Sequence, residues 1–188
     1  MVLSYPASKM KINGFIDLHT HGFKGYDTRT SDPVHILKMA RLYKGAGTDA
    51  FLPTIYPAPI DEMRKNMEAV RRAMEIQSSE FKVQGSRFKV QGSRPGVKTQ
   101  NSKLKIDNSS SSVILGVHLE GPFLNPVRCG ALDKSSFVRP TLSNLNRLIY
   151  GFEDIIRIIT FAPEMPGALR IIERCAELGI KVNMGHSD

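Results

Sequence analysis

The sequence predicts an α/β fold in which about five βα units form an incomplete TIM-type barrel. Short apolar segments alternate along the chain with amphipathic segments, the pattern of βα units around a parallel sheet. This pattern alone allows either a TIM-type barrel or a doubly wound sheet. The barrel is favoured because the polar residues suited to catalysis follow the apolar segments directly, and α/β barrels build their active sites at the carboxyl ends of their strands.

The first half of the chain is expected to contain two strands and two helices. Residues 14–19 (GFIDLH) form a strand, and residues 34–44 form a helix that ends at Gly45 and Gly47. Residues 49–52 form the second strand, which ends at Pro53. The apolar residues of the next segment recur at helical spacing and predict one buried helix face, made of Ile60, Met63, Met67, Val70 and Met74.

The second half is expected to add three strands and two helices. The strands are the apolar segments 113–119 (VILGVHL), 155–161 (IIRIITF) and 180–184 (IKVNM). Helices at 142–150 and 167–178 lie between them, and Gly179 caps the second helix. Residues 1–188 are therefore interpreted as one partial barrel domain.

A basic, low-complexity insertion is predicted to interrupt this domain at about residues 78–112. The heptapeptide FKVQGSR occurs twice in succession at 81–94, and a tract rich in Ser, Asn and Lys follows. Residues 81–106 contain seven basic and no acidic residues, so they account for nearly all of the net charge of +8. The segment has few aromatic residues and no known motif, which argues against a nucleic-acid partner and favours a solvated, largely disordered insertion.

The remaining composition predicts a cytoplasmic protein. No apolar run approaches the roughly 20 residues that span a bilayer, and the first residues lack the pattern of a signal peptide. The two cysteines, Cys129 and Cys175, are too few for a disulfide scaffold and lack metal-binding spacing. Membrane association and cysteine chemistry are therefore not expected.

Histidine and carboxylate side chains follow the predicted strands and predict a metal site. His19 and His21 are separated by one residue, so on an extended chain they point to the same side and can chelate one ion. Glu120 ends a buried strand, where a carboxylate needs a cation, and His186 follows the last strand. Other polar residues of this kind at strand ends are Glu164 and Asp188. His118 is interpreted as a hydrogen-bonded core residue rather than a ligand.

Five motifs together resemble those of the N-acetylglucosamine-6-phosphate deacetylases, within the amidohydrolase superfamily. They are IDLHTHG (16–22), FLPT (51–54), GVHLEGPFLNP (116–126), APE (162–164) and GHSD (185–188). The segment HLEGPFLNP is the most specific, because IDLHTHG alone identifies only the superfamily. The resemblance covers the N-terminal portion of a family member, from about residue 14 to residue 188 without the insertion.

The resemblance implies hydrolysis of the acetamide of N-acetylglucosamine 6-phosphate, an amino-sugar phosphate, to glucosamine 6-phosphate and acetate. Glu120 and His186 match metal ligands, and His19 and His21 match the ligands of an additional metal in two-metal members, so one or two zinc or iron ions are expected. Ala131 and Leu132 match a substrate-binding stretch, although Leu132 stands where the family commonly has histidine.

The family's catalytic aspartate is expected beyond residue 188, so no catalytic residue is assigned within the chain. Its small flanking β domain is also not matched. We therefore expect a fragment or truncated product that is inactive by itself, and a homodimer is left open. Two alternatives remain: a non-catalytic fragment, and another amidohydrolase that acts on a different amide. The second typically carries a bridging lysine where this chain has Glu120.

Overall fold

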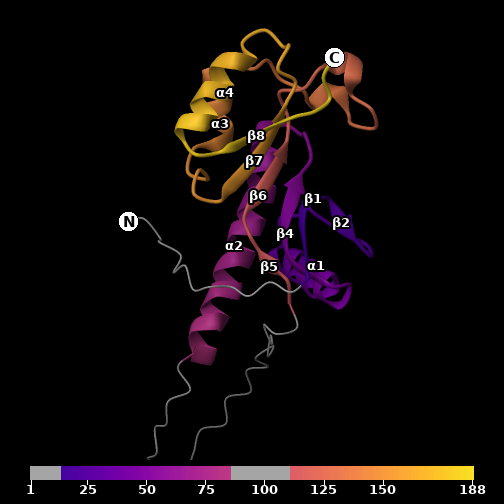
Figure 1. Ribbon diagram of the computed structural model, residues 1–188, viewed down its shortest axis with the longest axis vertical. Helices are drawn as coiled ribbons and strands as arrows, with labels where there is room; N and C mark the ends of the chain where they lie inside the picture. Colours follow the sequence, from indigo (N-terminus) through magenta and orange to yellow (C-terminus); the bar gives the residue numbers. More distant parts are fainter. Residues whose placement is uncertain (1–13, 86–110) are drawn as a thin grey trace, which may run out of the picture.

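The computed structural model describes residues 14–85 and 111–188, which form one parallel sheet with four covering helices (Figure 1). The longer elements are, in chain order, β1 (Phe15–Thr20), α1 (Pro33–Gly45), β4 (Thr48–Ile55), α2 (Ile60–Gly85), β5 (Val113–Ile114), β6 (Val117–Glu120), α3 (Leu142–Ile149), β7 (Ile156–Phe161), α4 (Ala168–Glu177) and β8 (Lys181–Met184). A short antiparallel pair, β2 (Gly22–Phe23) and β3 (Tyr26–Asp27), follows β1. Two 3₁₀ turns, η2 (Pro126–Arg128) and η3 (Lys134–Ser136), follow β6.

The strands are arranged in the sheet in the order in which they occur along the chain. The order is β1-β4-β6-β7-β8, with β5 also paired to β4, and every one of these pairs is parallel. A doubly wound sheet would reverse its strand order at a switch point, and no reversal occurs among the described strands. The predicted α/β class and parallel sheet are confirmed, and the sequential order is that of part of a TIM-type barrel.

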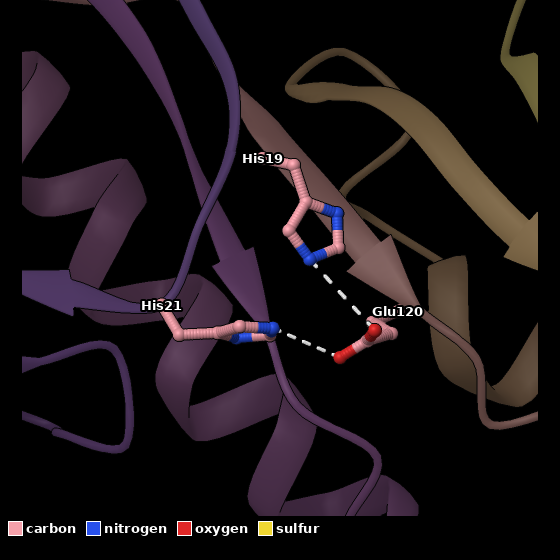
Figure 2. A group of neighbouring side chains, drawn as sticks. All are labelled: His19, His21 and Glu120. Atoms are coloured by element: carbon pink, nitrogen blue, oxygen red, sulfur yellow. Dashed lines mark ion pairs between the residues drawn. The ribbon is translucent and has the colours of Figure 1, made fainter. Parts of the chain in front are cut away.

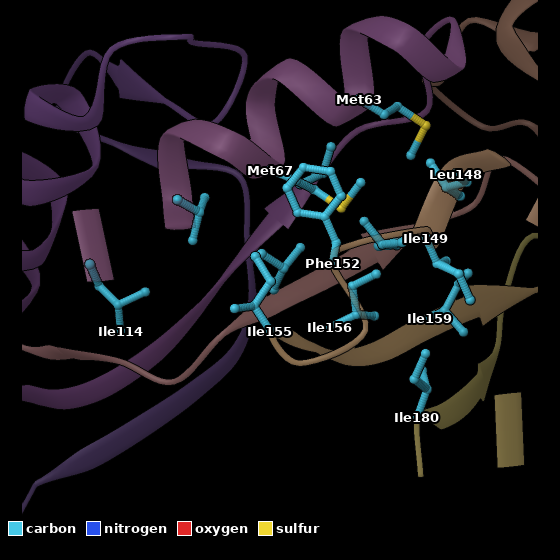
Figure 3. Close-up of a cluster of buried hydrophobic side chains, with 14 of the residues drawn as sticks. Met63, Met67, Ile114, Leu148, Ile149, Phe152, Ile155, Ile156, Ile159 and Ile180 are labelled. Atoms are coloured by element: carbon cyan, nitrogen blue, oxygen red, sulfur yellow. The ribbon is translucent and has the colours of Figure 1, made fainter. Parts of the chain in front are cut away.

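The helices follow the same order as the strands, and the hydrophobic core lies between the two layers. Helix α1 packs against α2, α2 against α3, and α3 against α4. Figure 3 shows side chains of α2 and α3, including Met67 and Ile149, packed with strand residues such as Ile159. The predicted helix face is confirmed as a core face, because Ile60, Met63, Met67, Val70 and Met74 are all buried.

Local signals explain where two of the helices begin and end. The side chain of Asp32 caps α1 by accepting a hydrogen bond from the Val34 backbone N–H, and Pro33 occupies the first helical turn. After α4, Gly179 has a φ of +75°, a left-handed conformation that favours glycine, as predicted for the residue that ends this helix. No described helix is both long and apolar enough to cross a membrane.

The two edge strands of the described sheet expose apolar side chains. Phe15 of β1 and Met184 of β8 are each 77% exposed, and Ile16 and Leu18 are also exposed. Among the described strands, β1 and β8 each have a neighbour on one side only. An apolar strand edge with unpaired backbone groups favours association, so low solubility is expected for this chain alone.

The structure differs from the predicted irregular insertion at both ends of that segment. Helix α2 continues through Gly85, so residues 78–85 extend a helix rather than begin an irregular segment. At the other end, Ser111 and Ser112 are buried beside the start of β5. Local composition suggested an irregular segment at both of these places, and it did not reveal the burial of Ser111 and Ser112. Residues 86–110 of the predicted insertion lie outside the described residues.

Gln77 joins α2 to the strand that follows. Its buried side-chain amide donates to the Ser112 carbonyl at 2.9 Å, and its Oε1 accepts from the Ile114 backbone N–H at 3.1 Å. We expect Gln77→Ala to lower the free energy of unfolding by about 1–3 kcal/mol, because a buried carbonyl and a buried N–H lose their partner. Urea unfolding measures the change. Glu75→Ala, on the exposed side of the same helix, should cost less than about 0.5 kcal/mol, and equal effects of the two substitutions would contradict this role.

Candidate metal centre

Three histidines and one glutamate from the ends of three strands, β1, β6 and β8, converge at one edge of the sheet. His21 Nε2 lies 2.9 Å from Glu120 Oε2, and His19 Nε2 lies 3.7 Å from Glu120 Oε1 (Figure 2). His186, beyond β8, places Nε2 3.2 Å from Glu120 Oε1. The ligand atoms of His19, His21 and Glu120 all lie within 4.8 Å of one another. Parallel strands bring their carboxyl ends to the same edge, which explains why residues so distant in the chain meet here.

Backbone carbonyls determine which ring nitrogen of two of these histidines carries the proton. His21 Nδ1 lies 2.9 Å from the Thr54 carbonyl, and His186 Nδ1 lies 2.9 Å from the Arg128 carbonyl. A carbonyl oxygen can only accept, so each Nδ1 must be the donor. In the neutral ring this leaves Nε2 a lone pair for a metal ion, whereas in the doubly protonated ring the Nε2–H can donate to Glu120, which lies 3.2 Å from Nε2 of His186. Histidines that bind metals are usually oriented by this kind of Nδ1 hydrogen bond.

The Glu120 side chain is a buried anion. The residue is 7% exposed, and its Oε2 has no donor aligned for a hydrogen bond although His21 Nε2 lies close to it. Burial acts to raise the pKa of Glu120, but the imidazoles of His21, His186 and His19 more than offset this and hold the pKa below its usual range. A buried carboxylate with an unsatisfied oxygen requires a nearby cation.

Protonated imidazoles could supply that positive charge, but His19 is poorly suited to do so. Burial lowers the pKa of His19, and the attraction of Glu120 reverses this only in part. A neutral imidazole leaves a lone pair for a metal ion. One carboxylate and several imidazole nitrogens are a donor set that suits zinc or iron. The residues therefore fit a divalent metal ion.

His118 belongs to the support of the centre rather than to its ligands. It is buried, with Nδ1 2.9 Å from the Leu18 carbonyl and Nε2 2.9 Å from Thr160 Oγ1, so both ring nitrogens already have partners. Burial lowers its pKa. The ring meets that of His19 edge to face, with 4.8 Å between centroids. The interpretation of His118 as a hydrogen-bonded core residue is confirmed.

Tyr56 contacts the centre and was not predicted from the sequence. Its ring stacks on His21 with 3.7 Å between centroids, and the Arg29 guanidinium lies over the ring at 4.6 Å. Arg29 in turn pairs with Asp27 at 2.8 Å. The stacked Tyr56 ring and Arg29 guanidinium restrict rotation of the His21 ring. Tyr56 follows β4 directly, so its place at a strand end was the available signal.

An open hollow lies beside His21. Its volume is about 490 Å³, and it is lined by Tyr56 and by the hairpin that β2 and β3 form. This space lies next to the His21 side of the centre, where a small molecule could approach.

The other predicted residues lie near the centre without completing it. Glu164 and Asp188 join a polar network around Asn125. Ala131 is exposed and Leu132 is half-buried, and both follow Gly130 in the loop after β6. A Cβ placed on Gly130 would lie 3.7 Å from the His186 ring, so this loop passes beside that histidine. The substrate contacts of Ala131 and Leu132 stay a prediction.

Known proteins with similar sequences are sugar-phosphate deacetylases. No protein-family model matches the chain. It is 29% identical over 184 residues to the N-acetylglucosamine-6-phosphate deacetylase of Bacillus subtilis, covering 97% of this chain and 39% of the relative. It is 25% identical over 173 residues to the N-acetylgalactosamine-6-phosphate deacetylase of Escherichia coli O157:H7, covering 92% of this chain and 38% of the relative.

The fold is also found in a solved deacetylase. The D267A mutant of the N-acetyl-D-glucosamine-6-phosphate deacetylase of Mycobacterium smegmatis, in complex with N-acetyl-D-glucosamine-6-phosphate, matches with a TM-score of 0.63 and 22% identity, over 93% of this chain and 36% of that one. The chain thus spans less than two fifths of the length of these relatives. As its motifs predicted, the chain is similar in sequence to N-acetylglucosamine-6-phosphate deacetylases over almost its whole length.

Proposed function

We propose that this chain provides the divalent-metal centre of an amide hydrolase that removes the acetyl group from N-acetylglucosamine 6-phosphate, giving glucosamine 6-phosphate and acetate. The observation that carries the proposal is the buried Glu120 carboxylate with the Nε2 atoms of three imidazoles directed at it. The names of the relatives support the reaction. The parallel strands of the sheet, with β5 and β6 counted as one, would then be five of the eight βα units of a complete barrel.

The donor set has room for one or two zinc or iron ions. Glu120 and His186 would hold one ion, and His19 and His21 would hold a second or complete the first. When bound, such an ion polarises an amide carbonyl and acidifies a water molecule. The Thr54 and Arg128 carbonyls keep Nε2 of His21 and His186 available as ligands.

The sugar would lie beside the loop after β6. Ala131 and Leu132 would contact it, and the Leu132 side chain offers an apolar contact without a hydrogen bond. The Escherichia coli relative named for N-acetylgalactosamine 6-phosphate makes that epimer the second substrate to test. Catalysis by Cys175 is not supported, because Cys175 is buried and its burial raises the thiol pKa to about 11. We place the protein in the cytoplasm, and a homodimer remains to be tested.

Cobalt substitution tests the proposal, because Co²⁺ binds the ligand types that zinc binds and absorbs visible light. We expect the chain to bind one or two equivalents of Co²⁺ at saturation, and a chelator should remove the bound ions. Millimolar N-acetylglucosamine 6-phosphate should then alter the visible spectrum more than glucosamine 6-phosphate, which lacks the acetamide. A chain that binds neither Co²⁺ nor Zn²⁺ would refute the metal centre, and equal spectra with both sugars would refute the substrate.

A further inference from the structure

His186 has a backbone conformation that needs support from its surroundings. Its φ is +52°, in the left-handed region that residues with a Cβ rarely adopt. Such conformations cost free energy and persist where neighbouring contacts hold them, often at functional sites. The contacts of this residue therefore identify what holds its ring toward Glu120.

The supporting contacts come from the loop after β6. The Asn125 backbone N–H donates to the His186 carbonyl at 3.1 Å, and His186 Nδ1 donates to the Arg128 carbonyl at 2.9 Å. Arg128 Nε also donates to Asp188 Oδ1 at 2.6 Å. Both the backbone and the ring of His186 thus depend on the position of residues 125–128.

Asn125 holds that loop with its buried side chain. Its Oδ1 accepts from the Val127 backbone N–H at 2.9 Å and caps η2, which ends at Arg128. Its Nδ2 donates to Glu164 Oε1 at 2.8 Å and lies 3.4 Å from Asp188 Oδ2. Glu164 Oε1 also accepts from the Asp188 backbone N–H at 3.1 Å. One amide thereby connects the loops that follow β6, β7 and β8.

We propose that Asn125, through its hydrogen bond to Glu164, is the positioning residue that holds His186 Nε2 toward Glu120. The inference rests on the proposed function, because holding His186 in place would raise the affinity of the proposed centre for metal. The contacts that support it belong to the metal-free protein, so it can be tested without metal as well.

Asn125→Asp tests the donor role while keeping the cap. The new carboxylate can still accept from the Val127 N–H, but it cannot donate to Glu164 and it repels that side chain. In the metal-free protein at pH 8, imidazole ¹⁵N NMR should show that His186 no longer favours the Nδ1–H tautomer. Zn²⁺ affinity should fall about 10- to 100-fold, the range found when outer-shell partners of metal ligands are changed.

A double variant that exchanges the amide and the carboxylate between positions 125 and 164 should restore the hydrogen bond. Adding Glu164→Gln to Asn125→Asp restores a donor–acceptor pair with reversed polarity and the wild-type net charge, so we expect the tautomer to return and the affinity to recover to within about threefold. Asp133→Asn is the matched control, since Asp133 caps η3 with the same geometry, accepting from the Ser135 N–H at 2.9 Å. It should change neither measurement.

Each outcome decides the inference. Should Asn125→Asp fail to fold, Glu164→Ala, at an exposed residue, removes the same hydrogen bond and should cause the same losses. An unchanged tautomer in whichever of these variants folds, or a folded double variant without recovery, would overturn the role of Asn125. If the wild-type chain binds no metal, the proposed function fails, and the NMR measurement alone decides the inference.

Discussion

Glu120→Gln is expected to lower the affinity of the chain for Zn²⁺ by more than about 100-fold, beyond the 10- to 100-fold range for partners outside the ligand set. Glu120 is the carboxylate that all three imidazoles face, and both of its oxygens take part in those contacts. The substitution preserves the shape of the side chain and removes its charge. Isothermal titration calorimetry with a competing chelator measures the change.

Two comparisons separate loss of a ligand from loss of the fold. Glu173→Gln, on the exposed side of α4, should leave Zn²⁺ affinity unchanged.

The pH dependence of stability gives the second comparison. Because the pKa of Glu120 is lowered in the folded protein, its ionised form stabilises the metal-free fold above its unfolded pKa of about 4.3. This contribution is lost as the pH falls through the folded pKa. Wild-type stability should therefore fall more steeply than that of Glu120→Gln in this acidic range. Zn²⁺ affinity equal to wild type in a folded Glu120→Gln would show that the carboxylate is not a ligand.

The 188-residue chain by itself is expected to hydrolyse N-acetylglucosamine 6-phosphate at or near the uncatalysed rate. It spans less than two fifths of the length of its relatives, and the His19 side chain of the centre is 46% exposed. An open site neither orients the substrate nor excludes water. Proton transfer by a positioned acid or base is typically worth ~10²- to 10⁴-fold, and the resemblance assigns that role to an aspartate that the described centre does not contain.

The measurement is acetate release by the purified, metal-loaded chain, with N-acetylgalactosamine 6-phosphate as the second substrate. Glu120→Gln supplies the background rate. Turnover that a chelator abolishes, that added metal restores and that Glu120→Gln lacks would contradict this expectation, and it would mean that the described residues suffice for catalysis.

Much of the fold could be predicted because its signals are local. Apolar runs such as 155–161 and helical spacing such as that of Met63 and Met67 depend only on neighbouring residues, and the structure places strands and helices at these positions. The extent of α2 could not be predicted in this way. Glycine and serine near residues 78–85 suggested an irregular segment, whereas α2 continues through Gly85. The buried pairing of Gln77 with Ser112 and Ile114 was also not predictable, because it joins residues more than thirty positions apart.

The candidate site shows the same division. The sequence alone indicated that His19, His21, Glu120 and His186 lie at or just after the ends of strands, because strand ends are visible in the order of apolar and polar residues. Only the tertiary structure decided that their ring nitrogens lie within 4 Å of one carboxylate, that Tyr56 stacks on His21, and that Asn125 supports His186. These contacts depend on which strands are neighbours and on backbone carbonyls from other loops, and neither is encoded in the residues adjacent to each ligand.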